Sequence, residues 1–237
     1  MLNSYLAQTG QLLQNPGAST ALYSTSDLTG YINRARSQLA AETECIRLMN
    51  TLTLTFGTQV YSFSSISPAT TGTAGVYNVR GATCSVASGF VWLSPRPFPW
   101  FQLYYLNNPV PQTGFPTTYA QFGQGVNGSL YFNPVPDFPY TVMLDCVCNP
   151  TALASDADPE DIPYPFTEAV PYYAAYLALL SAQRMADAQA MWQEYQKFAA
   201  RGRQLSNGAV NPAQYPQQPN LVRAGQLGMA QGGAAGG

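Results

Sequence analysis

The strongest constraint on the fold is the spacing of apolar residues, which changes at two points along the chain. Up to about residue 50, apolar positions such as Leu28, Ile32 and Leu39 recur every three or four residues, as on one face of a helix. Residues 51–149 instead form short runs rich in Thr, Val, Tyr and Phe, several with a period of two. Helical spacing returns after residue 166. The pattern predicts an α+β fold: a helical bundle from both chain ends with an inserted antiparallel β-sandwich or barrel of about seven or eight strands.

Capping and turn signals set the expected boundaries. The sequence Ser-Thr-Ser-Asp at residues 24–27 is a helix-start signal, and the helix after it is expected to continue to about Met49. The expected segments are the N-terminal helices in 1–50, the β-domain in 51–149, an acidic linker in 150–165, a C-terminal helical hairpin in 166–205 and an extended C-terminal arm in 206–237.

The C-terminal arm has a composition that cannot form a core of its own. It consists mostly of Gly, Ala, Gln and Pro and carries one charge, Arg223. The apolar surface it could bury would not offset the entropy lost on ordering, so we expect it to be mobile in a free subunit and ordered only on a partner. The residues expected to make that contact are Tyr215, Leu221, Val222, Arg223, Leu227 and Met229.

Charge and histidine content exclude several functions. Charged residues make up 9% of the chain, against roughly 25% in an ordinary soluble domain. So few charges suit a surface covered by neighbours, and a net charge of −2 gives no overall basic field for gripping nucleic acid. The absence of histidine removes Ser-His-Asp and Cys-His triads and His-based zinc sites. We expect no enzymatic activity, no metal and no cofactor.

Paired carboxylates can hydrolyse glycosides without histidine, so the acidic residues need separate treatment. Most of them fall on expected helix faces or in the acidic linker, and Asp145, in an expected strand, has no evident partner. The four acids Asp156, Asp158, Glu160 and Asp161 lack the glycine and the distant glutamate of a calcium loop, which favours a solvated loop.

Two glycine motifs have structural interpretations. Residues 123–128, GQGVNG, match the dinucleotide fingerprint, but strand and turn residues follow them where the fingerprint needs a helix, so a hairpin turn is expected. Asn127-Gly128-Ser129 matches the glycosylation sequon and is interpreted as part of that turn.

The aromatic residues around position 100 allow two interpretations. Trp92, Trp100, Tyr104 and Tyr105 could form a face that binds carbohydrate or a proline-rich peptide. Aromatic residues in strands more often belong to a core or a subunit contact, and we favour this second interpretation.

The cysteines and the N-terminus indicate the compartment. Cys45, Cys84, Cys146 and Cys148 contain no CxxC pair, which favours structural thiols in a reducing cytoplasm over disulfides. The N-terminus lacks the basic start and apolar core of a signal peptide, and the most apolar stretch, 169–180, is too short to span a bilayer. The chain is therefore expected to be made in the cytoplasm, or to be part of something assembled there, without a membrane partner.

The order of these segments resembles the head-to-tail adaptor family of short-tailed phages, which includes tail tubular protein A and related tail accessory factors. The order of helices, β-domain, acidic linker, helical pair and arm matches over residues 1–205. The segments that carry the resemblance are LNSYLAQTGQLLQNPGA (2–18), YSTSDLTGYINRAR (23–36) with CIR (45–47), GFPTTYAQFG (114–123) with GSLYFNPVPDFPYTVMLD (128–145), and IPYPFTEAVPYYAAYLALLSAQRMADAQAMWQEY (162–195).

The resemblance implies a structural subunit of the virion neck. Such a subunit forms a homo-oligomeric ring, commonly twelvefold, beneath the portal protein. The helical part and the arm would contact the portal, the β loops would contact the tail or nozzle protein below, and DNA would pass through the lumen without sequence-specific binding. The alternative is a different virion β-domain protein, from a tail fibre or a capsid decoration, that binds receptor carbohydrate.

Overall fold

The N-terminal apolar stripe forms two helices that end before the β-domain. In a computed structural model, which describes residues 1–15, 22–66, 73–86, 89–107 and 112–208, α1 is Leu2–Leu12 and α2 is Thr25–Thr43. The Ser24 side chain caps α2 by accepting a hydrogen bond from the Asp27 backbone N–H. The expectation that α2 continues to Met49 is wrong. Glu44 adopts a left-handed conformation (φ 51°) that ends the helix, and a strand begins at Arg47.

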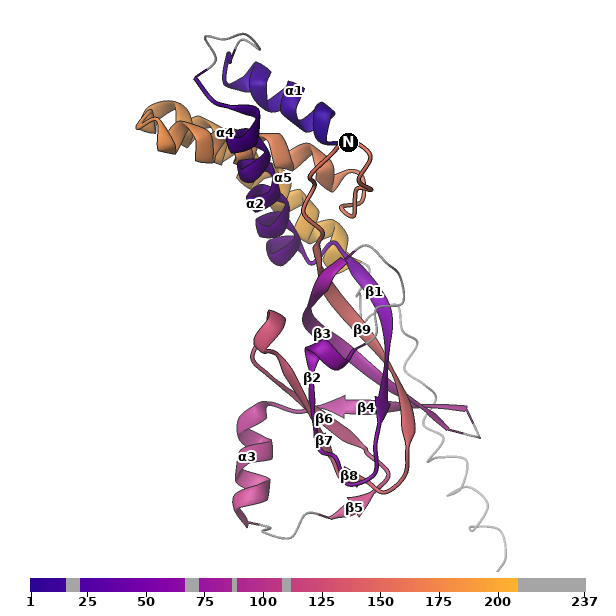
Figure 1. Ribbon diagram of the computed structural model, residues 1–237. Helices are drawn as coiled ribbons and strands as arrows, with labels where there is room; N and C mark the ends of the chain where they lie inside the picture. The colour runs from indigo at the N-terminus through magenta and orange to yellow at the C-terminus, as the bar shows by residue number, and fades with distance from the viewer. Residues whose placement is uncertain (16–21, 67–72, 87–88, 108–111, 209–237) are drawn as a thin grey trace, which may run out of the picture.

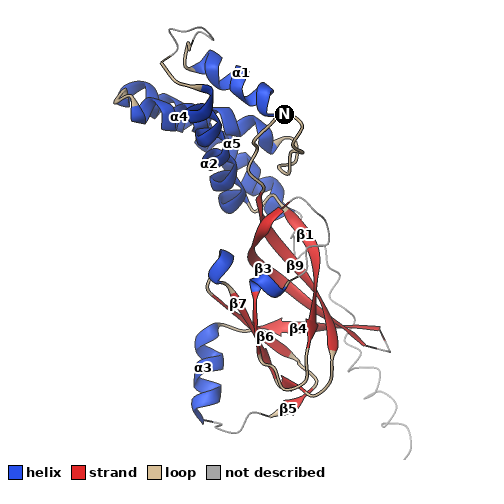
Figure 2. Cartoon of the chain, viewed as in Figure 1, coloured by secondary structure: helices blue, strands red, loops and turns tan. Residues whose placement is uncertain are grey.

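The C-terminal helical pair forms as predicted and is longer than expected. The helices are α4 (Val170–Ser181) and α5 (Met185–Gly208), so residues 206–208, assigned to the arm from the sequence, are helical. Helix α4 contacts α1, α2 and α5, and its buried alanines allow these helices to approach closely. Figures 1 and 2 show these four helices gathered at one end of the molecule and the strands at the other.

The strands form one curled, mixed sheet rather than an antiparallel sandwich. Its order is β1-β9-β3-β4-β6-β7-β2, and β4 and β6 are parallel neighbours. Two further short strands, β5 and β8, pair in parallel. The bounds are β1 Arg47–Leu54, β2 Val60–Ser62, β3 Thr73–Val86, β4 Gly89–Pro95, β5 Thr113–Gly114, β6 Thr118–Phe122, β7 Ser129–Asn133, β8 Val135–Pro136 and β9 Tyr140–Pro150.

Helix α3 (Phe98–Asn107) explains why the sheet is mixed. A strand can return parallel to its neighbour only through a crossover connection, and α3 lies in the connection between β4 and β6. The sequence placed the aromatic run 98–105 in the β-domain 51–149 without predicting a helix there. Three short 3₁₀ helices complete the described structure: η1 Phe63–Ser65, η2 Gly125–Asn127 and η3 Phe166–Ala169.

One apolar core joins the two ends of the molecule. It includes Ile32 and Leu39 of α2, Leu144 and Cys146 of β9, and Tyr195 of α5. Because helices and strands share this core, the position of the helical end relative to the sheet is fixed by packing. None of the described helices is long and apolar enough to cross a membrane.

Candidate functional site

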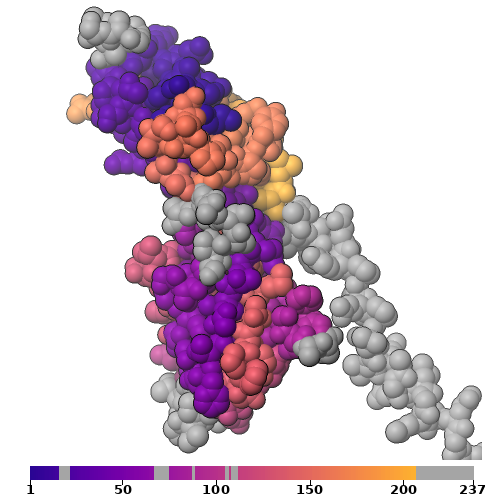
Figure 3. Space-filling model, turned by 45° about the vertical axis from the view of Figure 1, so that its right-hand side comes forward, coloured from indigo at the N-terminus to yellow at the C-terminus, as the bar shows by residue number. Residues whose placement is uncertain are grey.

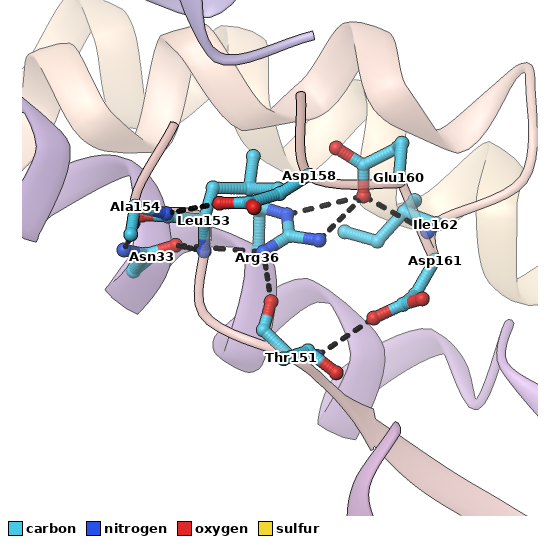
Figure 4. Close-up of polar contacts among 9 residues, drawn as sticks. All are labelled: Asn33, Arg36, Thr151, Leu153, Ala154, Asp158, Glu160, Asp161 and Ile162. Atoms are coloured by element: carbon cyan, nitrogen blue, oxygen red, sulfur yellow. Dashed lines mark hydrogen bonds and ion pairs between the residues drawn. The ribbon is translucent and has the colours of Figure 1, made fainter. Parts of the chain in front are cut away.

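The acidic linker is a structural element. It was expected to be a solvated loop, but its carboxylates accept specific hydrogen bonds (Figure 4). Asp158 accepts from the backbone N–H groups of Ala154 and Ser155, both at 2.7 Å, and these bonds hold its pKa below the ordinary value. Asp161 accepts from the Thr151 N–H at 2.7 Å. Within the described ranges, no group of three or more Cys, Asp or Glu residues is arranged to hold a metal ion.

The Arg36 guanidinium attaches this linker to α2. Its side chain is fully buried, and its Nη2 lies 2.7 Å from Oε1 of Glu160, whose side chain is 8% exposed. Arg36 Nη1 also donates to the Thr151 carbonyl, and the Asn33 side-chain amide exchanges two hydrogen bonds with the backbone of Leu153. Burial, followed by the Glu160 carboxylate, raises the pKa of the neighbouring Tyr5 phenol. These bonds hold the chain against α2 as it leaves the sheet.

Asp145, the acid left without a partner by the sequence, is part of an ion pair. The Arg47 guanidinium of β1 donates both Nε and Nη2 to the Asp145 carboxylate of β9. The pair links strands that are adjacent in the sheet. Asp145 is thus accounted for by a structural role between strands.

The GQGVNG motif is a hairpin turn, as predicted. It connects the antiparallel strands β6 and β7 through the 3₁₀ helix η2. Gly123 has φ +74°, and a Cβ there would lie 2.8 Å from the Asn127 carbonyl oxygen, so the turn requires glycine at this position.

The clearest exposed apolar surface is on β4, where Phe90 is 68% and Trp92 61% exposed. Residues 89–93, here called the hairpin edge, pair with β3 on one side. No strand among the described residues pairs with their other side, since β6 meets β4 only at Ser94 and Pro95. The Trp92 ring lies over Gly81, where a Cβ would come within 2.7 Å of it. The Trp92 side chain is therefore held in place while most of it remains exposed.

A second surface is a cleft of about 430 Å³ between β3, the start of α3 and the β6–β7 turn. Arg80 and Arg96 line it, and no carboxylate does. Arg80 is paired with Glu44 at 3.0 Å, but its Nη1 is buried and has no hydrogen-bond partner within the described structure. The guanidinium of Arg96 lies 5.5 Å from the centre of the Trp100 ring. This surface is called the arginine cleft below.

Exposed apolar side chains occur on the elements that border the arginine cleft. Trp100 and Leu103 of α3 are 37% and 61% exposed, and Phe122 and Val126 of the β6–β7 turn are 53% and 88% exposed. Figure 1 shows α3 and this turn on one side of the β-domain, while the ends of β3 and β4 reach out on the opposite side. The space-filling view in Figure 3 shows the compact helical end of the molecule above the β-domain.

Some of the candidate contact residues chosen from the sequence lie in the described structure and others do not. Trp92 and Trp100 are exposed on these two surfaces, and Tyr104 stacks on Trp100 with ring centres 5.5 Å apart. The Tyr105 side chain lies outside the described part. So do all the residues expected to contact the portal: Tyr215, Leu221, Val222, Arg223, Leu227 and Met229.

Sequence reasoning missed the hairpin edge and the arginine cleft. The edge had a signal, since Gly89–Pro95 is a short strand with three consecutive apolar residues before Leu93 and no charge. Charged residues, proline and bulges are the usual means of protecting an open strand edge. The cleft had no signal, because three segments distant in sequence form it.

These features define a class of protein: a structural component that acts through contacts with other proteins. The model of the SU10 adaptor protein family matches residues 4–219, and the chain belongs to this family. A search of curated proteins finds no match. The family assignment confirms the predicted phage head-to-tail adaptor, and a structural virion protein follows from it. The closer likeness to tail accessory factors stays a prediction.

Proposed function

We propose that the protein is a ring subunit of the head-to-tail connector, linking the portal protein to the tail around the DNA channel. The observation that carries the proposal is the uncharged, exposed hairpin edge, with Phe90 and Trp92 facing solvent. Exposed strand edges of this kind pair with other chains unless a partner covers them. In an adaptor, neighbouring copies of the same chain are the partners that are always present.

The elongated form suits a part that joins two others. We infer that the helical end faces the portal and that the β-domain faces the tail or nozzle protein. The resemblance to short-tailed phage adaptors favours this orientation and a twelvefold ring. Heterologous contacts generate such rings, in contrast to the isologous contact of a two-fold dimer.

The arm is the proposed anchor on the portal. Its contact residues would be the apolar side chains and the single arginine named above, with Arg223 donating to an acidic or carbonyl-lined site. Helix α5 ends at Gly208 and sets the direction in which the arm begins.

The charges support passage of DNA without sequence-specific binding. Ten basic residues are balanced by twelve acidic ones, and six of the basic side chains are in ion pairs within the described structure. A surface that grips DNA needs a band of unpaired basic groups. We also infer that the protein is made in the host cytoplasm and functions in the virion neck.

The alternative, recognition of receptor carbohydrate by the β-domain, has less support. A sugar-binding aromatic needs an open ring face, whereas the Trp100 ring already contacts Arg96, Phe101 and Tyr104. Pull-down on immobilised glycans tests this alternative directly.

The test of the proposed function is assembly with the portal protein of the same phage. Purified portal mixed with the full chain should give a complex that contains a closed ring of this chain on one end of the portal, visible by negative-stain electron microscopy. If the two proteins elute separately on gel filtration at micromolar concentrations, the proposal is wrong.

A further inference from the structure

We propose that the ring contact is made by the hairpin edge of one copy inserting into the arginine cleft of the next copy. The inference rests on the proposed ring and goes beyond it, because it names the surfaces that meet. The hairpin edge is residues 89–93 of β4, and the arginine cleft lies between β3, α3 and the β6–β7 turn.

The hairpin edge has the properties of an inserting element. Consecutive residues of a strand point to opposite faces, yet Phe90, Val91 and Trp92 are all exposed. Apolar side chains are therefore presented on both faces of the same strand, and backbone N–H and C=O groups without a partner strand in the described structure lie between them. A flat docking partner would cover one face only, whereas a cleft covers both faces and the edge.

The arginine cleft offers what such an element needs. Arg80 and Arg96 line the cleft and no carboxylate does, so their accessible guanidinium N–H groups are donors from which the open carbonyls of the hairpin edge can accept hydrogen bonds. Guanidinium groups also bind aromatic faces, so Arg80 and Arg96 can contact the rings of Phe90 and Trp92. The exposed apolar residues on α3 and on the β6–β7 turn would pack around the entering strand.

The placement of the two surfaces favours a second copy as the occupant. The ends of β3 and β4 lie on the opposite side of the β-domain from α3 and the β6–β7 turn, which border the cleft, so one copy can offer its hairpin while receiving that of its other neighbour (Figure 1). Such a heterologous contact, between two different surfaces of neighbouring copies, repeats around an axis and closes into a ring. Two copies of the hairpin edge that met each other would instead give a two-fold dimer.

In the test, the photo-crosslinker p-benzoylphenylalanine replaces Phe90 in the full chain. This chain is assembled on the portal, and the complex is then irradiated. We expect a ladder of covalent oligomers in which residue 90 is joined to the peptides containing Arg80, Arg96 or 119–124 of another copy. To show that the link joins two copies, chains labelled with heavy isotopes are mixed with unlabelled chains before assembly. Mass spectrometry should then find crosslinked peptide pairs with one heavy and one light member. The same group in place of Phe56, which is 70% exposed elsewhere on the β-domain, is the matched control and should give no link to these peptides.

A second variant, Phe90→Ser, should weaken ring assembly at least about tenfold, as expected for loss of a central aromatic contact, while Phe56→Ser should not. Normal ring formation by Phe90→Ser, together with crosslinks from p-benzoylphenylalanine at position 90 to other peptides only, would overturn the hairpin contact while leaving the connector function intact. If the wild-type chain forms no oligomer on the portal, both the contact and the proposed function fail.

Discussion

The guanidinium of Arg36 on α2 lies 2.7 Å from the carboxylate of Glu160 in the linker after β9, and both side chains are buried. This ion pair closes a connection across 124 residues of sequence. It attaches the linker that follows the β-domain to the helix that precedes that domain, so the chain leaving the sheet is held against α2 by a polar contact as well as by the shared core.

Removing one partner of this pair should destabilise the chain strongly. Arg36→Met leaves the Glu160 carboxylate buried and uncompensated, which should lower the free energy of unfolding by about 3–5 kcal/mol in urea titrations. The double variant Arg36→Met/Glu160→Leu should recover much of that loss, because no uncompensated charge remains. Lys197→Met, which breaks an exposed pair, is the control and should cost less than about 1 kcal/mol. A single Arg36→Met variant as stable as the control would contradict the structural role.

Alkaline pH should destabilise the β-domain through two buried groups. Burial raises the pKa of the Cys146 thiol to about 12 and that of the Tyr119 phenol to about 12, from ordinary values of 9.0 and 10.0. The fold therefore favours their neutral forms. Their contribution is complete below the ordinary pKa values and is lost as the pH rises towards 12.

The free energy of unfolding, measured in urea at a series of pH values, should fall between pH 9 and 12 by this mechanism. Tyr119→Phe should make the decrease above pH 10 less steep, and Tyr164→Phe, at a 78% exposed position, should not. Identical slopes for wild type and Tyr119→Phe would refute this mechanism.

Two glycines should respond to alanine in opposite directions. Gly30 is in the interior of α2, and a Cβ added there would meet nothing within 4 Å beyond its own helix, so Gly30→Ala should stabilise by about 0.5–1 kcal/mol. Gly81→Ala should destabilise, because the new methyl group would displace the Trp92 ring. Thermal unfolding gives both signs, and a change in tryptophan emission should accompany Gly81→Ala only.

Truncation after Gly208 should separate folding from docking. The described core ends with α5, so the shortened chain should unfold with the same midpoint as the full chain. Its affinity for the portal, measured by biolayer interferometry, should fall at least about tenfold, because the arm anchors would be missing. A truncated chain that binds the portal as tightly as the full chain would exclude the arm as the anchor.

The sequence predicted the parts of the fold that depend on local patterns. The three-four spacing located α2, α4 and α5, and the glycine turn at residues 123–128 was correctly assigned as a hairpin. The end of α2 was misplaced because Ile46 continues the apolar spacing, although Glu44 has already left the helix. Helix α3 was missed because its aromatic residues favour strands, and its helical form follows from the crossover it makes.

The candidate surfaces depend on tertiary contacts, so local sequence patterns contain less information about them. Arg47 and Asp145 are 98 residues apart, and only the pairing of β1 with β9 brings them together. The arginine cleft likewise requires the parallel pairing of β4 with β6, which no local pattern specifies. The hairpin edge is the exception, because a charge-free apolar strand can be recognised in the sequence once strand edges are considered.

The most direct test of the central claim is a cryo-electron microscopy reconstruction of the neck of purified virions, averaged about the tail axis. We predict a closed ring of this chain between the portal and the tail, with the helices towards the portal and the hairpin of each copy in contact with the next. Density for this chain on tail fibres or on the capsid surface, with none in the neck, would contradict the claim.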